Sequence, residues 1–196
     1  MKIDHIPETN HAPVQPSESE MLTEFRAEQE KERWRSRHPV PSSVALLAGV
    51  LSGVIAGVGM ALVLLWREGA NGVEVWTPMQ LMAATFYGAE ALHGGAQVIL
   101  VGEIVHAVIA IGYGLIFSFF VSRATPLGMA FLYGLVYSVL IWGVMTYMVL
   151  PLVDPVMQRA EALQPNWWFI SHLVFGALLF LTPLLKNAFA STDFHR

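Results

Sequence analysis

Two histidines stand within strongly apolar stretches of this sequence, where an imidazole is the side chain best suited to chemistry. His106 lies in LVGEIVHAVIAIGYGLIFSFF and His172 lies in ISHLVFGALLF. Measured back from the basic residues that follow them, Arg123 and Lys186, the two differ in depth by about 4.5 Å at a helical rise of about 1.5 Å per residue. Two imidazoles at similar depth on different helices could be the axial ligands of a b-type haem.

The surroundings of His106 and His172 leave three interpretations open. For a haem, small residues would leave room for the ring, namely Ala110, Gly114 and Gly176. For a quinone headgroup or a proton path, Glu103 and Tyr113 would add polar groups beside His106. The simplest alternative is that each imidazole hydrogen-bonds a neighbouring helix, which is a common role of polar residues in membranes.

A Glu-x-x-His spacing occurs twice, at Glu90 with His93 and at Glu103 with His106. This is the i, i+3 spacing of di-iron carboxylate bundles, whose sites also need two further inward-facing glutamates. The first and third apolar runs contain no acidic residue in their cores. The sequence therefore predicts no metal site.

The composition places these residues inside a membrane protein. Of the 196 residues, 55% are hydrophobic and only 13% are charged, a balance far from that of soluble domains. Four runs are long enough to cross a hydrocarbon core, which takes roughly 20 helical residues, and they cover 44–66, 97–121, 127–150 and 167–185. We expect an all-α integral membrane protein with a four-transmembrane-helix bundle.

The basic residues near the ends of the runs predict the orientation. KERWRSRH precedes the first run, Arg123 follows the second and Lys186 follows the fourth, against Arg67 and Arg159 in the other loops. The positive-inside rule then makes both termini cytoplasmic. Tryptophans would anchor the opposite interface, and they are Trp66, Trp76, Trp167 and Trp168.

The polar segment 1–40 precedes a predicted membrane domain at 41–188 and a short tail at 189–196. Residues 1–16 have a composition typical of disorder. Residues 17–38 favour an amphipathic cytoplasmic helix, with acidic residues early and basic residues late. This helix would lie against lipid headgroups or dock a partner subunit through Leu22, Phe25 and Trp34.

Two loops repeat one another in composition and order. WTPMQLMAATFYGAEALHGG follows the first run and DPVMQRAEALQPNWW follows the third. Each opens with a candidate N-cap, Thr77 or Asp154, then a proline, then Ala-Glu-Ala-Leu and a helix breaker. Each leads into a run with one early histidine. We therefore expect two tandem helical hairpins with short interfacial helices, related by a pseudo-twofold axis along the membrane normal.

The first run carries glycine at every fourth position, at Gly49, Gly53 and Gly57. Small residues at this spacing form a flat helix face against which another backbone packs closely. Gly176 in the fourth run is a further packing candidate. The helix that covers the glycine face could belong to this chain or to a second protein.

At GVLSGVIAGVGMALVL, EIVHAVIAIGYG and ISHLVFGALLF, the chain resembles uncharacterised bacterial four-helix inner-membrane proteins. These pair a glycine-rich first span with His-x-x-x-small motifs in later spans, and the resemblance covers about residues 44–186. It implies a multi-pass protein of the bacterial inner membrane. It supplies no catalytic residues.

These features favour a binding or structural role over catalysis. The net charge of −4 and the lack of a recognisable RNA- or DNA-binding signature exclude nucleic acid as a partner, and no hydrolase or nucleotide-binding motif occurs. Our first hypothesis is a non-catalytic subunit of a larger membrane complex, in respiratory or photosynthetic electron transport, that binds its neighbours through the glycine face and the polar head. The alternatives are a haem- or quinone-binding protein using His106 and His172, and an oligomeric transporter or channel.

Overall fold

The computed structural model describes residues 17–37 and 42–192. The chain divides into two compact units, and the boundary in the sequence falls between Pro39 and Val40. The predicted disordered segment 1–16 and the last tail residues, 193–196, lie outside the described residues. The first unit contains one helix, α1 (Glu18–Arg37), within the predicted range 17–38. Its Leu22 and Phe25 are exposed, and the side chain of Trp34 is outside the described part.

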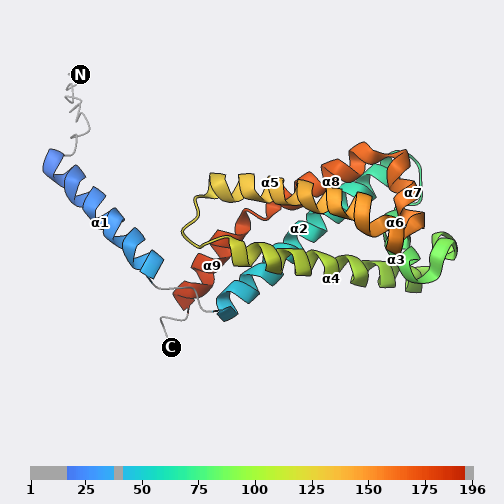
Figure 1. Ribbon diagram of the computed structural model, residues 1–196, viewed down its shortest axis with the longest axis horizontal. Helices are drawn as coiled ribbons and strands as arrows, with labels where there is room; N and C mark the ends of the chain where they lie inside the picture. The colour runs from blue at the N-terminus through green and yellow to red at the C-terminus, as the bar shows by residue number, and fades with distance from the viewer. Residues whose placement is uncertain (1–16, 38–41, 193–196) are drawn as a thin grey trace, which may run out of the picture. The chain divides into compact units, whose positions relative to one another are not determined.

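Every regular element in the described part of the second unit is a helix (Figure 1). Its elements are α2 (Ser42–Ala70), α3 (Thr77–Tyr87), the 3₁₀ helix η1 (Gly88–His93), α4 (Ala96–Phe120), α5 (Leu127–Val144), the π-helical η2 (Met145–Val149), α6 (Leu150–Val153), α7 (Pro155–Leu163), α8 (Pro165–Leu178) and α9 (Leu181–Thr192). The described residues contain no strand, so the all-α prediction is confirmed.

Four helical segments are long and apolar enough to cross a membrane, at Ser42–Ala70, Ala96–Phe120, Leu127–Val153 and Pro165–Ser191. The predicted runs fall on these segments. The first extends four residues past the predicted end at Trp66, and the last continues beyond residue 185 into the predicted tail. Within a helix the backbone N–H and C=O groups are paired inside the segment, which is the requirement for crossing lipid.

Helices α2 and α4 pack closely because small residues line both sides of their contact. A methyl group added at Gly53 would lie 2.6 Å from the backbone oxygen of Ala110, and one at Gly114 would lie 2.5 Å from the backbone of Gly49 and Gly53. At Gly57 it would lie 2.7 Å from the Ala110 side chain. The glycine face is therefore filled by a helix of the same chain, which decides the alternative that the sequence left open.

A second close pair is formed by α5 and α8. An added methyl group at Gly134 would lie 2.1 Å from the backbone oxygen of Gly176, and Gly176 in turn faces Ser138. Gly176 is thus a packing residue, in the role expected for it. Such contacts replace the hydrophobic driving force that lipid does not supply.

Prolines interrupt the third and fourth spans. The third passes through π-helical η2 just before Pro151, and the fourth breaks between Leu178 and Leu181, just before Pro183. Proline has no N–H to donate and its ring clashes with the carbonyl four residues earlier, so it kinks or breaks a helix. The fourth run is therefore two helices, where the sequence analysis expected one.

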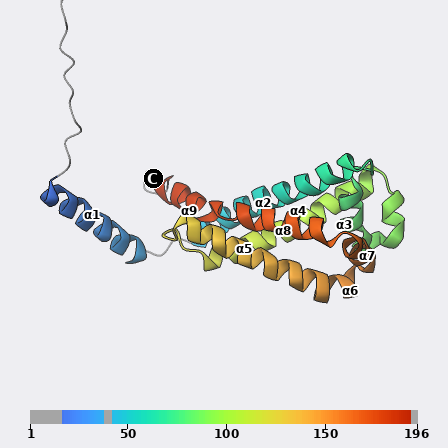
Figure 2. The same cartoon turned by 90° about the horizontal axis from the view of Figure 1, so that it is seen from above.

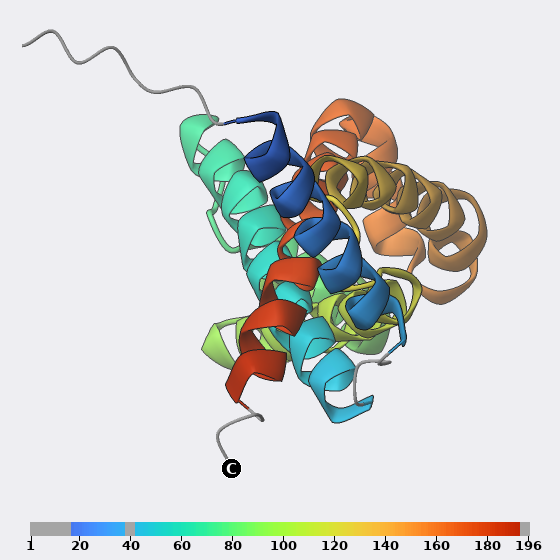
Figure 3. The same cartoon turned by 90° about the vertical axis from the view of Figure 1, so that its left-hand side faces the viewer.

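The short helices α3 and α7 lie together at one end of the second unit, whereas α9 lies beside α2 toward the other end (Figures 2 and 3). Asp154 caps α7 by accepting a hydrogen bond from the Met157 N–H at 2.9 Å, as predicted. Its other oxygen accepts from the Thr85 hydroxyl at 2.9 Å and so joins α7 to α3. The predicted Thr77 cap is wrong, because its hydroxyl donates to the Glu74 carbonyl and Trp76 takes the N-cap position.

Lys186 of α9 is hydrogen-bonded to the end of α4. Only 4% of this residue is exposed, and its ammonium donates to the carbonyl of Ser118 and, at 2.6 Å, to that of Val121. These are the unpaired carbonyls at the end of α4, where positive charge is favourable. In the sequence Lys186 serves only as a basic residue that follows the fourth run, and the structure buries it as a helix cap.

Candidate functional site

A cavity of about 50 Å³ lies inside the second unit, and residues of both helix pairs form its walls. It has room for more than one water molecule, since one needs roughly 10–15 Å³. Most of its surface is apolar. The polar side chains that line it are His106, Tyr113, Thr146, Glu161 and His172.

His106 reaches the cavity from α4. Only 7% of the residue is exposed, and its Nε2 lies 3.0 Å from the backbone oxygen of Gly57 on α2. A carbonyl oxygen only accepts, so Nε2 carries the hydrogen and Nδ1 of the neutral ring is left with a free lone pair. A side chain at Gly57 would clash with Ala110 at 2.7 Å, whereas it would lie at an ordinary contact distance of 3.5 Å from Nε2 of His106.

His172 reaches the same cavity from α8. Its Nδ1 lies 2.8 Å from the carbonyl of Trp168, one turn earlier in the same helix. By the same reasoning Nδ1 carries the hydrogen and Nε2 of the neutral ring is an acceptor. The structure thus brings together the two histidines that the sequence analysis singled out, with one acceptor nitrogen on each.

Glu161 of α7 also lines the cavity, and the sequence analysis did not select it. It is 2% exposed and accepts a hydrogen bond from the hydroxyl of Thr146 in η2. Burial raises the pKa of the Glu161 carboxyl above its usual value, and contacts with Thr146 and the Trp142 indole offset part of this rise. The repeated Ala-Glu-Ala-Leu was the available signal, because it contains Glu161.

Several cavity walls are formed by flexible or aromatic side chains. Four methionines contribute, Met60, Met82, Met145 and Met157, and their unbranched side chains adapt readily to a ligand's shape. Trp168 is another wall, with 6% of its surface exposed. The prediction that Trp168 anchors the membrane interface is wrong, whereas Trp66 and Trp76 are exposed.

The cavity does not fit a haem. Ligation by both histidines would need a free Nε2 or Nδ1 from each ring on a shared iron, with the macrocycle between them. The volume of about 50 Å³ is only a third of the roughly 150 Å³ that holds a single benzene, far too small for a macrocycle. Gly114, which was expected to leave room for the ring, packs against the backbone of α2, and Ala110 lines the cavity but also packs against Gly57 of α2.

Glu103 lies outside this cavity. It lines a groove of about 150 Å³ between α2 and α4, together with His106 and apolar residues. No hydrogen bond joins Glu103 to His106 within the described part of the chain. The matching pair, Glu90 and His93, is exposed on η1. Across residues 17–37 and 42–192, no group of three or more acidic or histidine side chains is placed to hold a metal.

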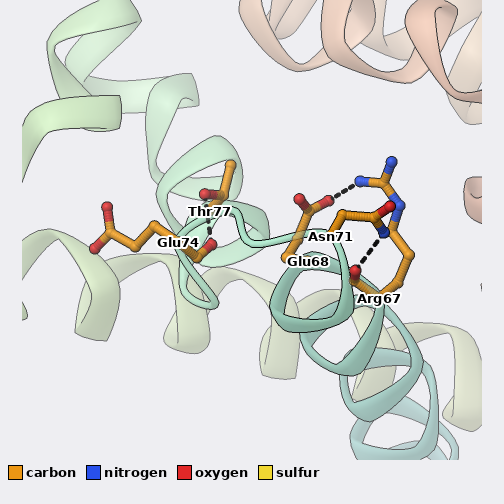
Figure 4. Close-up of polar contacts among 5 residues, drawn as sticks. All are labelled: Arg67, Glu68, Asn71, Glu74 and Thr77. Carbon is orange, nitrogen blue, oxygen red and sulfur yellow. Dashed lines mark hydrogen bonds and ion pairs between the residues drawn. The ribbon is translucent and has the colours of Figure 1, made fainter.

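A second polar cluster lies at the end of α2 (Figure 4). The buried Arg67 guanidinium pairs with the Glu68 carboxylate, and the Asn71 amide donates to the Arg67 carbonyl at 2.7 Å. The Glu74 side chain points away from this pair. The Asn71 amide is thus a second donor to the Arg67 carbonyl, which also accepts from the Asn71 backbone N–H at 3.2 Å.

No protein-family model, curated protein or solved structure matches this chain. The cavity is therefore interpreted from its own geometry.

Proposed function

We propose that this protein binds a small, ring-shaped, hydrogen-bonding molecule of the quinone class in the membrane. One observation carries the proposal. The same cavity, whose walls are otherwise mostly apolar, is lined by His106 of α4, Glu161 of α7 and His172 of α8. Apolar walls with a few convergent polar groups are typical of small-molecule sites. Ionisable residues inside a membrane domain are costly and usually functional.

A ring would require the cavity to enlarge about threefold, to the roughly 150 Å³ that accommodates benzene. The methionine walls supply this adaptability, because their side chains can change rotamer without moving a helix backbone. The π-helical turn at Met145–Val149 forms part of the same wall, and such turns often occur at functional sites.

Filling the cavity tests this function. Ile109 lines the cavity, whereas Ile104 of the same helix is 54% exposed on the outer face. With the protein purified in detergent, calorimetric titration with a short-chain quinone should show saturable binding. Ile109→Phe should abolish binding and Ile104→Phe should retain it. An equal loss of quinone affinity in both variants would reject the proposal. So would the absence of saturable binding to the wild type.

We also propose the finer architecture that the sequence suggests. The order α2, α3, α4 parallels α5, α7, α8, with a small-residue contact in each half, and this supports two tandem hairpins with interfacial helices α3 and α7. The distribution of basic residues supports cytoplasmic termini, and the resemblance of the sequence supports the bacterial inner membrane. Cysteines introduced into the α3–α4 and α4–α5 loops should differ in labelling by an impermeant maleimide.

A second candidate function is a non-catalytic subunit of a larger, energy-transducing membrane assembly. The observation that favours it is α1, whose Met21, Leu22 and Phe25 are each more than half exposed. An amphipathic cytoplasmic helix of this kind can dock a partner or lie on lipid. Because α4 fills the glycine face, α1 would carry the association.

The native mass after mild detergent extraction tests the subunit function. A defined assembly with co-migrating polypeptides, lost in Leu22→Glu/Phe25→Glu, would support docking by α1. A matched Thr23→Glu/Ala27→Glu variant adds the same charge without removing large apolar side chains. A lone particle in native membranes would count against this function.

A further inference from the structure

The hydrogen-bonding character of the cavity distinguishes the two redox forms of a quinone-class ligand. A quinone oxygen is a carbonyl and only accepts hydrogen bonds, whereas a quinol oxygen is a hydroxyl that both donates and accepts. The preferred form therefore depends on whether the cavity offers acceptors, donors or both.

Hydrogen bonds to backbone carbonyls fix the tautomer of both histidines, so that each neutral ring keeps one nitrogen as an acceptor. The Gly57 carbonyl holds the hydrogen on Nε2 of His106 at 3.0 Å, and the Trp168 carbonyl holds it on Nδ1 of His172 at 2.8 Å. Each neutral ring therefore has one unprotonated nitrogen.

The other polar groups of the cavity are satisfied by either redox form. The Tyr113 hydroxyl can donate or accept, and so can a protonated Glu161 carboxyl. Thr146 already donates to Glu161. A quinone would accept from Tyr113 but would leave the imidazole acceptors without a donor. A quinol would satisfy both kinds of group.

We infer that this cavity selects the hydroxyl-bearing quinol over the carbonyl-bearing quinone of the same carbon skeleton. This inference rests on the proposed function, since it names which form of the ligand the same cavity holds. An acceptor buried without a donor costs enough to weaken binding by about tenfold or more. The quinol should bind more tightly by at least that factor.

Duroquinol and duroquinone are a suitable pair of probes, because they have the same heavy atoms and differ in two hydroxyl hydrogens. The chain has no cysteine, so the reductant that keeps duroquinol reduced leaves the protein's covalent structure unchanged. Binding of each probe to the full chain in detergent is measured by isothermal titration calorimetry near neutral pH.

His172→Phe keeps a ring but removes the acceptor nitrogen, and its lost partner is a carbonyl of its own helix, so the fold should tolerate it. This variant should prefer duroquinol less strongly than the wild type, because only the His106 acceptor remains. His93→Phe is the matched control, because His93 is exposed on η1 away from the cavity. His172→Gln restores a side-chain acceptor and should recover part of the preference for duroquinol.

The outcomes separate this inference from the proposed function. A preference of about tenfold for duroquinol, reduced in His172→Phe and unchanged in His93→Phe, supports the inference. Equal affinities, or tighter binding of duroquinone, would overturn it and leave the binding function intact. A preference of undiminished size in a folded His172→Phe would also overturn it. Saturable binding of neither probe would remove both.

Discussion

Two glycines of α4, separated by one residue, should respond in opposite directions to the same substitution. A methyl group added at Gly114 would lie 2.5 Å from the Gly49 oxygen and the Gly53 Cα, and one at Gly112 would meet nothing within 4 Å. Ordinary contacts begin near 3.4 Å, so the new methyl group of Gly114→Ala would lie about 0.9 Å too close to the rigid backbone of α2.

Helices α2 and α4 must then separate, since neither backbone has a rotamer to change. A gap of this size forfeits roughly a quarter to a half of each affected dispersion contact, and overpacking typically costs about 1–3 kcal/mol. Gly112→Ala introduces no clash and gains up to about 1 kcal/mol of helix propensity. We expect the two variants to differ in unfolding free energy by about 2 kcal/mol or more.

The measurement is reversible unfolding in mixed micelles of a mild detergent and sodium dodecyl sulfate, followed by circular dichroism. Gly114→Ala should unfold at a lower dodecyl sulfate fraction than wild type, and Gly112→Ala at an equal or higher one. If the two variants unfold together, the close α2–α4 contact is not a main source of stability and this reasoning fails.

Three further predictions concern the polar groups. Lys186→Met removes the cap on the α4 carbonyls and should cost about 1–3 kcal/mol, with faster amide exchange in the last turn of α4 as the specific readout; unchanged exchange would contradict the cap. Asp154→Ala loses the α7 cap and the α3 link and should cost about 1–2 kcal/mol, whereas Thr85→Val loses only the link and should cost less; a larger loss in Thr85→Val would refute this order. The folded-state pKa of Glu161 is raised, so the folded protein binds this proton more tightly than the unfolded chain. Its contribution to stability is then complete below about pH 4.5, the unperturbed value, and is lost as pH rises through the raised folded-state pKa. Glu161→Gln should flatten this decline in unfolding experiments at several pH values, while the exposed Glu90→Gln should not.

The spans were predictable because their signal is local. An apolar run of about 20 residues needs no partner to be recognised, and the four expected runs fall on the four candidate spans. The Asp154 cap was equally local, since the carboxylate and the N–H that it satisfies are three residues apart. Thr77 had the same sequence signal, but its hydroxyl donates to the Glu74 carbonyl in the preceding turn and so does not cap α3.

The candidate site was predictable only in part. The histidines were conspicuous because an imidazole is rare in an apolar run, and a similar depth suggested that they could meet. Glu161 was missed because it lies in a short polar helix, where a glutamate normally faces water. Its burial depends on α7 folding back so that the carboxyl reaches Thr146, 15 residues away in the chain.

The sequence by itself determined that this chain forms apolar helices, where the first three spans begin and end to within four residues, and which helices carry small-residue faces. These properties depend on composition and on contacts within one or two helical turns. Only the tertiary structure decided what those faces meet. It placed α4 on the glycine face, buried Lys186 at the end of α4, turned Trp168 inward, and gathered His106, His172 and Glu161 around one cavity. Each of these arrangements joins residues far apart in sequence, and its energy comes from packing and desolvation that exist only after the helices have assembled.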